Sequence, residues 1–177
     1  MIDIQQLRHE YNQGYRDFSG ISLHNIDLKQ SHLSGVNFSQ CDLSGADLSG
    51  ADLSRSDLIS ANLTDADLTK VDLSGSKLMG ANFIGADLSE ASLVGANLSQ
   101  ADLRMANLEG ADLRGTNLSG VIVSGANFSN ANLTAACLDE TELDEADHDG
   151  ANLCHLRTPV VNGANNKTHR WVSWGAH

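Results

Sequence analysis

A five-residue pattern, in close variants of Ala-Asp-Leu-Ser-Gly, repeats in phase from Arg16 to His155. The centre of each unit is Leu or Phe, from Phe18 onward in steps of five residues, and only Val123 and His148 depart from this rule. A small residue usually stands two positions before the centre, and Asp or Asn usually stands one position before it. A period of five matches neither the period of about 3.6 of a helix nor the period of about 2 of a strand, so the sequence predicts a stack of repeats.

The pattern resembles that of the pentapeptide-repeat family, and the resemblance covers about four fifths of the chain. It implies that four units make one turn of a right-handed quadrilateral β-helix, with the centres and the small residues pointing inward. We therefore expect an all-β fold of about seven coils over residues 16–155. The regular, Leu-centred repeats are similar to those of cyanobacterial members. A lead-in typical of these members is also present, in Leu7, Arg8, Tyr11, Gly14, Arg16, Asp17 and Phe18.

A narrow square tube needs one large apolar residue on each side and a small one beside it, and Leu with Ala meets this need. Thirteen of the 16 glycines stand two residues after a centre, where a corner favours a positive φ. The centres chosen to represent the expected core are Phe18, Phe38, Leu48, Leu68, Phe83, Leu88, Leu108 and Phe128.

The two ends of the chain differ from the repeats, as the ends of a stacked array require. Residues 1–15 are expected to form a short helix, in which Ile4, Leu7 and Tyr11 make one apolar stripe over the first coil. Residues 156–177 lose the period and contain both tryptophans, Trp171 and Trp174. This segment is interpreted as a cap or tail, with an aromatic anchor for a partner as the alternative.

Charge and composition exclude several classes of function. The net charge of −12 argues against direct binding to nucleic acid or to an anionic membrane. The sequence has neither a signal-like start nor an apolar run long enough to span a membrane, so we expect a cytoplasmic protein. It shows no phosphate loop, zinc motif or catalytic triad, which predicts that the protein is not an enzyme and has no cofactor or metal.

Three cysteines, an odd number, do not indicate a disulfide framework. Cys41 occupies an inward position and is expected in the core, whereas Cys137 and Cys154 fall at outward positions, where a redox or metal role is the lesser alternative. His148 occupies an inward centre, so we expect it to be buried and hydrogen-bonded or to distort the coil locally. A metal site of His148 with Asp147, Asp149, Cys154 and His155 is the minor alternative, since no ligand spacing is diagnostic.

Residues 20 apart should stack in columns, and one outward column on the third side is acidic: Asp27, Asp47, Asp67 and Asp87. Like charges at this spacing repel one another. The column is explained either by the turn preference of Asp, by an acidic strip that faces a basic partner, or by a bound cation. A second acidic cluster follows near the end of the repeats, in Asp139, Glu140, Glu142, Asp144, Glu145, Asp147 and Asp149.

Apolar residues also stand at outward positions. Ile59 and Met79 share a column on adjacent coils, and Ile84 lies just round the next corner, so these three are candidates for a partner contact. Met105 and Ile122 are outward on the side that bears Ile84. Isolated apolar residues on a surface are also common without a function.

Two functions follow from these observations. The first is a non-catalytic structural or protein-interaction scaffold of unassigned process, which binds an unidentified partner protein through a flat face or an end. The alternative is an acidic mimic of DNA that binds DNA gyrase or another DNA-binding protein, as the family resemblance implies for some members. Regular Leu-centred repeats favour the scaffold over the mimic.

Overall fold

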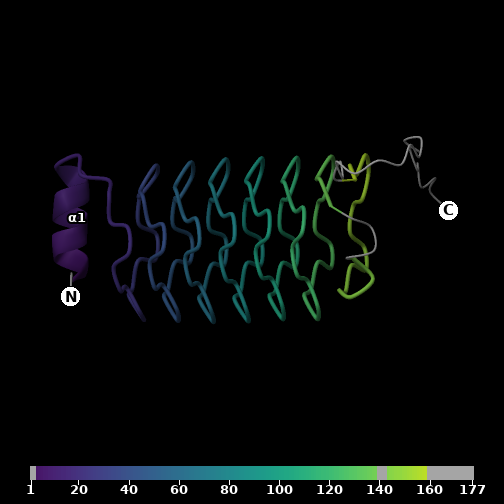
Figure 1. The fold of residues 1–177 in the computed structure, drawn as a ribbon, viewed down its shortest axis with the longest axis horizontal. Coiled ribbons are helices and arrows are strands. Elements are labelled where there is room, and N and C mark those ends of the chain that lie inside the picture. Colours follow the sequence, from purple (N-terminus) through teal and green to yellow (C-terminus); the bar gives the residue numbers. More distant parts are fainter. Residues whose placement is uncertain (1–2, 139–142, 159–177) are drawn as a thin grey trace, which may run out of the picture.

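The computed structural model describes residues 3–138 and 143–158. Helix α1 (Ile4–Asn12) lies across one end of a long stack of similar coils, which runs from the amino-terminal to the carboxy-terminal part of the chain (Figure 1). Each coil is displaced from the last along a single axis, so residues about 20 apart in sequence become neighbours in adjacent coils. The surface of this stack therefore repeats with the sequence.

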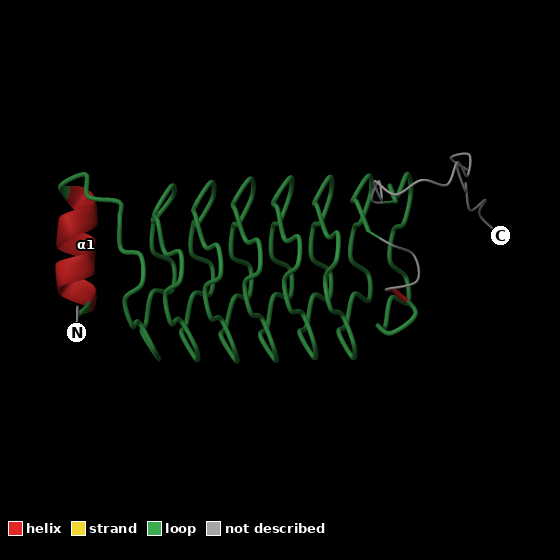
Figure 2. Cartoon of the chain, viewed as in Figure 1, coloured by secondary structure: helices red, strands yellow, loops and turns green. Residues whose placement is uncertain are grey.

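Parallel β-bridges join residues 20 apart throughout the stack. Four ladders of bridges begin at Asp17, Ser22, Asp27 and His32, and we name them the first to fourth sides. The last bridge joins Cys137 to Arg157. In the described residues the bridges are isolated rather than grouped into strands, which is why the cartoon shows turns and loops between the ends (Figure 2). The expectation of an all-β chain is therefore corrected: the described coils consist of isolated bridges and turns, with one helix before them. A turn at every corner leaves only one bridged residue on each side.

The hydrogen bonds of one unit show how the coils are held together. Asp47 N–H donates to the Ile26 carbonyl of the preceding coil at 2.9 Å. Leu48 N–H and Gly50 N–H donate to the backbone carbonyls of Asp67 and Thr69 in the following coil, at 2.7 and 2.8 Å. The same pattern recurs along the stack, so most backbone groups of an interior coil are satisfied by its two neighbours.

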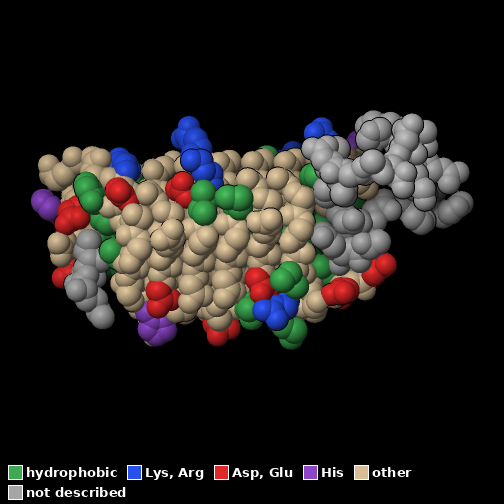
Figure 3. All heavy atoms as spheres, in the orientation of Figure 1, with side chains coloured by type: hydrophobic (Ala, Val, Ile, Leu, Met, Phe, Trp, Pro, Cys, Tyr) green, Lys and Arg blue, Asp and Glu red, His purple; other side chains and the backbone are tan. Residues whose placement is uncertain are grey.

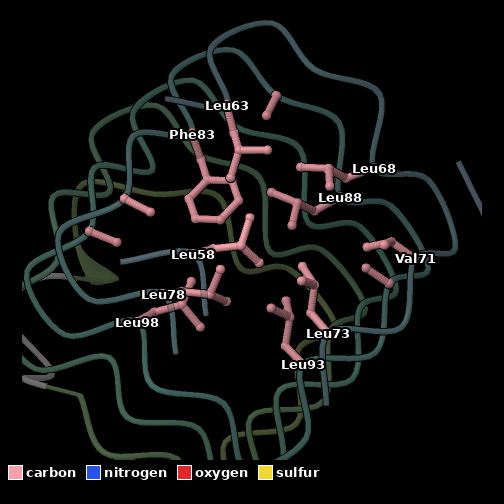
Figure 4. Packing of buried hydrophobic residues seen from close by; sticks show 14 of the residues in the cluster. Leu58, Leu63, Leu68, Val71, Leu73, Leu78, Phe83, Leu88, Leu93 and Leu98 are labelled. Carbon is pink, nitrogen blue, oxygen red and sulfur yellow. The ribbon is translucent and has the colours of Figure 1, made fainter. Parts of the chain in front are cut away.

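The interior is filled by the centres and the small residues. All eight representative centres named above are at most 3% exposed. Figure 4 shows successive residues from equivalent sides packed against one another, such as Leu63 with Phe83 and Leu68 with Leu88. Cys41 is also buried, and its thiol donates to the Phe18 carbonyl at 2.9 Å. A filled interior leaves the outer faces and the ends as the places where a ligand could bind.

Helix α1 closes the first coil through packing and polar contacts. Leu7 is fully buried, with Ile4 and Tyr11 partly buried against the core, as the apolar stripe predicts. The Tyr11 hydroxyl donates to the Ser34 carbonyl at 2.8 Å. The Arg16 guanidinium lies 3.8 Å from the centre of the Tyr11 ring, which fixes the chain between α1 and the first coil.

The coil loses its regular register before its last turn. In regular coils the corner N–H bonds to the residue 19 positions on, as Gly45 does with Thr64, but Gly125 N–H donates to the Glu145 carbonyl. Leu143 is buried in a short helical turn. His148 is half-buried and its Nδ1 donates to the Ala146 carbonyl at 3.1 Å, so it is hydrogen-bonded close to the distorted segment. The five-residue pattern of the sequence therefore continues through a segment in which the backbone register changes.

Candidate interaction surfaces

The acidic column is a continuous ladder on the third side. Parallel bridges join Asp27 to Asp47, Asp47 to Asp67, and Asp67 to Asp87. Asp27 and Asp67 are exposed, whereas Asp47 and Asp87 are half-buried. The four carboxylates predicted from the 20-residue spacing are thus brought together on one face, and we call them the acidic ladder.

Each carboxylate of the acidic ladder is also held by its own turn. One oxygen of Asp47 accepts from the Ser49 N–H at 3.1 Å and from the Ser49 hydroxyl at 2.6 Å. Lys29 Nζ lies 3.5 Å from Asp27 Oδ2 and 3.9 Å from Asp47 Oδ2. The Ser49 hydroxyl and N–H, together with the charge of Lys29, lower the pKa of Asp47 despite some desolvation. These local bonds explain how stacked carboxylates are tolerated.

The same turn occurs on the other sides of the coil. Asp52 on the fourth side accepts from the Ser54 N–H and hydroxyl at 3.0 and 2.7 Å. The Ser54 hydroxyl is the main cause of the lowered pKa of Asp52. The hydrogen bonding of the acidic ladder is therefore a property of the repeat, and only the unbroken run of four carboxylates distinguishes this face.

Apolar side chains form a second surface, across the corner between the first and second sides. Ile59 and Met79 occupy adjacent coils of the first side, where Ser60 N–H donates to the Met79 carbonyl at 3.0 Å. Met79 is 41% exposed, while Ile59 and Ile84 are half-buried. Ile59 and Met79 are thus neighbours on the first side, Ile84 follows on the second side, and Met79 is the most exposed of the three.

Two further residues extend this surface along the second side. Met105 is 69% exposed and Ile122 is 48% exposed, more than any of the three candidates chosen from the sequence. Arg104, the residue before Met105, and Asp102, which is bridged to Ile122, form a two-pronged ion pair with contacts of 2.7 to 3.1 Å. We call the whole set the apolar band: Ile59, Met79, Ile84, Met105 and Ile122. Their outward register was readable in the sequence, but their degree of exposure was not.

Figure 3 shows hydrophobic side chains in small groups among charged ones on one face of the stack.

In the described residues no three His, Cys, Asp or Glu side chains are grouped as metal ligands would be. Cys137 is half-buried, and burial raises the pKa of its thiol, while Cys154 is exposed. No helix within residues 3–138 and 143–158 is long and apolar enough to cross a membrane.

Part of the expected surface lies outside the described residues. This applies to the tryptophans, Trp171 and Trp174, and to Asp139, Glu140 and Glu142 of the second acidic cluster. Within the described part of that cluster, the Glu145 carboxylate accepts a hydrogen bond from the Ser124 hydroxyl.

Comparison with known proteins gives one strong family match. The model of the family described as pentapeptide repeats matches the chain in eight copies, over residues 17–50, 37–75, 46–85, 81–120 and 112–147. No curated protein sequence matches the chain.

Several solved structures are similar to this one. HetL, a pentapeptide repeat protein involved in heterocyst differentiation regulation in Nostoc sp. strain PCC 7120, shares 26% identity over 89% of this chain and 95% of its own, with a TM-score of 0.41. A pentapeptide repeat protein of the Arabidopsis thaliana thylakoid lumen shares 34% identity over 62% of this chain and 79% of its own, with a TM-score of 0.48. QnrB1, a plasmid-mediated fluoroquinolone resistance protein, shares 16% identity over 81% of this chain and 94% of its own, with a TM-score of 0.51. The family match and the likeness of fold to QnrB1 support the right-handed β-helix.

Proposed function

Because the chain belongs to the pentapeptide repeat family, we propose that it is a non-catalytic, cytoplasmic scaffold that binds a partner protein through the apolar band. Residues 16–155, about seven coils, form the scaffold in this proposal, with residues 1–15 and 156–177 as its end segments. The observation that carries the proposal is the exposure of Met105 and Ile122 at 69% and 48% beside a core that is almost fully buried.

The composition of the apolar band suits a protein contact. Methionine and arginine are enriched in interfaces, and methionine adapts to the shape of its partner. Arg104 directly precedes Met105 and occupies the place equivalent to Ile84 in the next coil, where its carbonyl accepts from Gly85 N–H. Ile122 is bridged to Asp102, the partner of Arg104. A partner that covers this region would bury apolar side chains around one ion pair whose two charges already neutralise each other.

Capture of partners from a host lysate tests this proposal. The Met105→Lys, Ile122→Lys variant should lose the proteins that the native protein retains, as identified by mass spectrometry. Both changes suit the fold, because Lys70 and Lys77 already stand at the equivalent places in their units. Ser92→Lys with Ala135→Lys on the fourth side adds the same charge at the same kinds of position and is the matched control. Equal retention by both variants would rule out the apolar band.

A DNA mimic is the second candidate, and the unbroken acidic ladder is the observation that favours it. Its four carboxylates follow one another on successive coils, whereas the phosphates of DNA have a closer spacing. This candidate predicts that the native protein inhibits supercoiling by DNA gyrase at micromolar concentration and that salt weakens the effect. Changing all four residues to Asn should preserve the fold, because Asn107 and Asn127 already continue the same ladder. The variant should lose inhibition, because it no longer carries the four negative charges. Absence of inhibition by the native protein would exclude gyrase as the target.

A further inference from the structure

The first coil keeps backbone groups that later coils use for pairing. On the second side, Asp42 N–H donates to the Ile21 carbonyl at 3.1 Å, and the Asp42 carbonyl accepts from Leu23 N–H at 2.7 Å. Ser22 occupies the same position one coil earlier, and in the described part of the chain neither its N–H nor its carbonyl has a hydrogen-bond partner. Ser22 is exposed, so these groups form an accessible edge.

Helix α1 covers a different part of this end. Its polar contacts reach the fourth side, where Arg8 donates to the Ser31 hydroxyl at 3.2 Å and Tyr11 donates to the Ser34 carbonyl. At the start of α1, an open hollow of about 640 Å³ remains between the helix and the corner that joins the second and third sides. Ser22 lines this hollow.

The lining of the hollow combines apolar and acidic groups. Ile4, Leu23 and Ile26 contribute apolar surface, and the carboxylates come from Asp3, Asp27 and Asp42. Lys29 pairs with Asp27, but in the described residues Asp3 and Asp42 form no ion pair. One oxygen of Asp3 accepts from Gln6 N–H at 2.8 Å, and one oxygen of Asp42 accepts from the Ser44 hydroxyl at 2.6 Å.

His24 at the hollow is held by contacts with two neighbouring side chains. His24 Nδ1 lies 2.9 Å from the Ser44 hydroxyl, and His24 Nε2 lies 2.8 Å from the Asn25 amide nitrogen. Because the Ser44 hydroxyl donates to Asp42, Nδ1 is the donor in the first contact and Nε2 accepts in the second. The three carboxylates of the lining therefore favour a cation in the hollow.

We propose that an extended segment of a partner protein pairs with Ser22 at this end and places a lysine or arginine side chain in the hollow. The segment would continue the second side by one parallel step, accepting from Ser22 N–H and donating to the Ser22 carbonyl as the neighbours of Asp42 do. The aliphatic stem of this lysine or arginine would pack against Ile4, Leu23 and Ile26. Its charged group would pair with the carboxylates of Asp3 and Asp42. Addition of a strand to an exposed edge is an established mode of peptide recognition.

A defined peptide tests the pairing. The probe is a blocked, fluorescein-labelled heptapeptide of alternating valine and lysine, and its binding to the full chain is followed by fluorescence anisotropy at physiological salt. We expect a micromolar dissociation constant. A peptide with glutamate in place of lysine, and one with alternate backbone amides methylated, should each bind at least about tenfold more weakly. Equal binding of the methylated peptide would overturn the edge pairing.

Variants of the protein separate the hollow from general attraction to an acidic protein. Asp3→Asn with Asp42→Asn should weaken binding by at least about tenfold, while preserving the helix cap and the turn, since Asn serves both. Asp52→Asn with Asp72→Asn removes the same charge from the fourth side and should leave binding within about twofold. Equal weakening by the two pairs would overturn the assignment to the hollow.

Ser22→Pro removes the N–H that the segment would use. Within the described residues this N–H donates no hydrogen bond, so the fold does not need it. This variant should keep its melting temperature and bind the peptide at least about tenfold more weakly. Unchanged binding by a folded Ser22→Pro variant would refute the proposal. The proposal would also be refuted if the peptide fails to bind and sedimentation shows a doubled mass, because a second copy would then cover this end. Met105→Lys with Ile122→Lys should not affect the peptide, so failure here is distinct from failure of the apolar band.

Discussion

Among the described residues, those two positions after a centre adopt a positive φ whether or not they are glycine, with Glu145 as the exception. Gly95 has a φ of +66°, and Asn25 and Asp65 have φ of 56° and 54°. Where a side chain occupies a corner, glycine usually follows one coil later: a Cβ added at Gly45 would overlap Asn25 Oδ1, and one at Gly85 would overlap Asp65 Oδ1. Glycine therefore serves both the backbone angle and the space that the previous corner needs.

The cost of the left-handed corner can be measured at Gly95, where an added Cβ would meet no atom within 4 Å. Gly95→Ala should lower the free energy of unfolding by about 1 kcal/mol, because only the backbone angle is unfavourable. Gly95→Asn should cost less, since Asn tolerates this conformation. Urea unfolding of the two variants compares them directly, and an equal loss for both would contradict this explanation.

Hydrogen-bonded carboxylates should make stability depend on pH in acid. The Ser54 hydroxyl lowers the pKa of Asp52 in the folded protein, so the charged form contributes stability above the ordinary pKa of Asp, about 3.9. That contribution is lost as the pH falls through the lowered pKa. The native protein should exceed Asp52→Asn in melting temperature at pH 7, and the difference should shrink below about pH 4. A difference that is constant from pH 7 to pH 2 would contradict the role given to the charge.

At the scale of elements, α1 acts on the coil through a single buried side chain and a few polar contacts. Leu7 is fully buried, whereas Gln5 on the same helix is exposed. The Asp3 side chain caps the start of the helix by accepting from Gln6 N–H. A helix of nine residues has little stability alone, so its order depends on packing against the first coil.

Leu7→Ala should therefore release the cap and destabilise the protein by about 3 kcal/mol. Amide hydrogen exchange should accelerate most at Phe18 and Leu23, whose N–H groups bond from the first coil to the second. Leu88, in the middle of the stack, should change less. Gln5→Ala is the control on the same helix and should leave exchange at all three amides unchanged. Uniform acceleration along the chain would indicate that α1 is part of one global unit instead.

Across the whole molecule, one filled core holds the stack together. Leu88 is fully buried between coils, and the adjacent Ser89 is half-buried and faces outward. Coils contact only their neighbours, so damage in the middle divides the stack into two shorter pieces. Outward positions, in contrast, accept charge, as Lys29 does at the place equivalent to Ser89 on the same side.

Leu88→Lys should unfold the protein or destabilise it by more than about 4 kcal/mol, because it buries an unpaired charge. Ser89→Lys should change the melting temperature by only a few degrees, since the side chain stays in water. Thermal unfolding followed by circular dichroism compares the two variants. A Leu88→Lys variant with a native melting temperature would show that the inward register is wrong.

The sequence alone determined the repeat, the inward position of residues such as Leu88 and Cys41, and the alignment of Asp27 with Asp47. These follow because each unit imposes the same local constraints, and residues 20 apart must then coincide. The tertiary structure decided features that depend on contacts between different units. It showed the change of register at Glu145, the exposure of Met105, and the hollow beside Ser22. Such features arise where a neighbouring coil or helix ends or alters its side chains, and a local five-residue pattern carries no information about those neighbours.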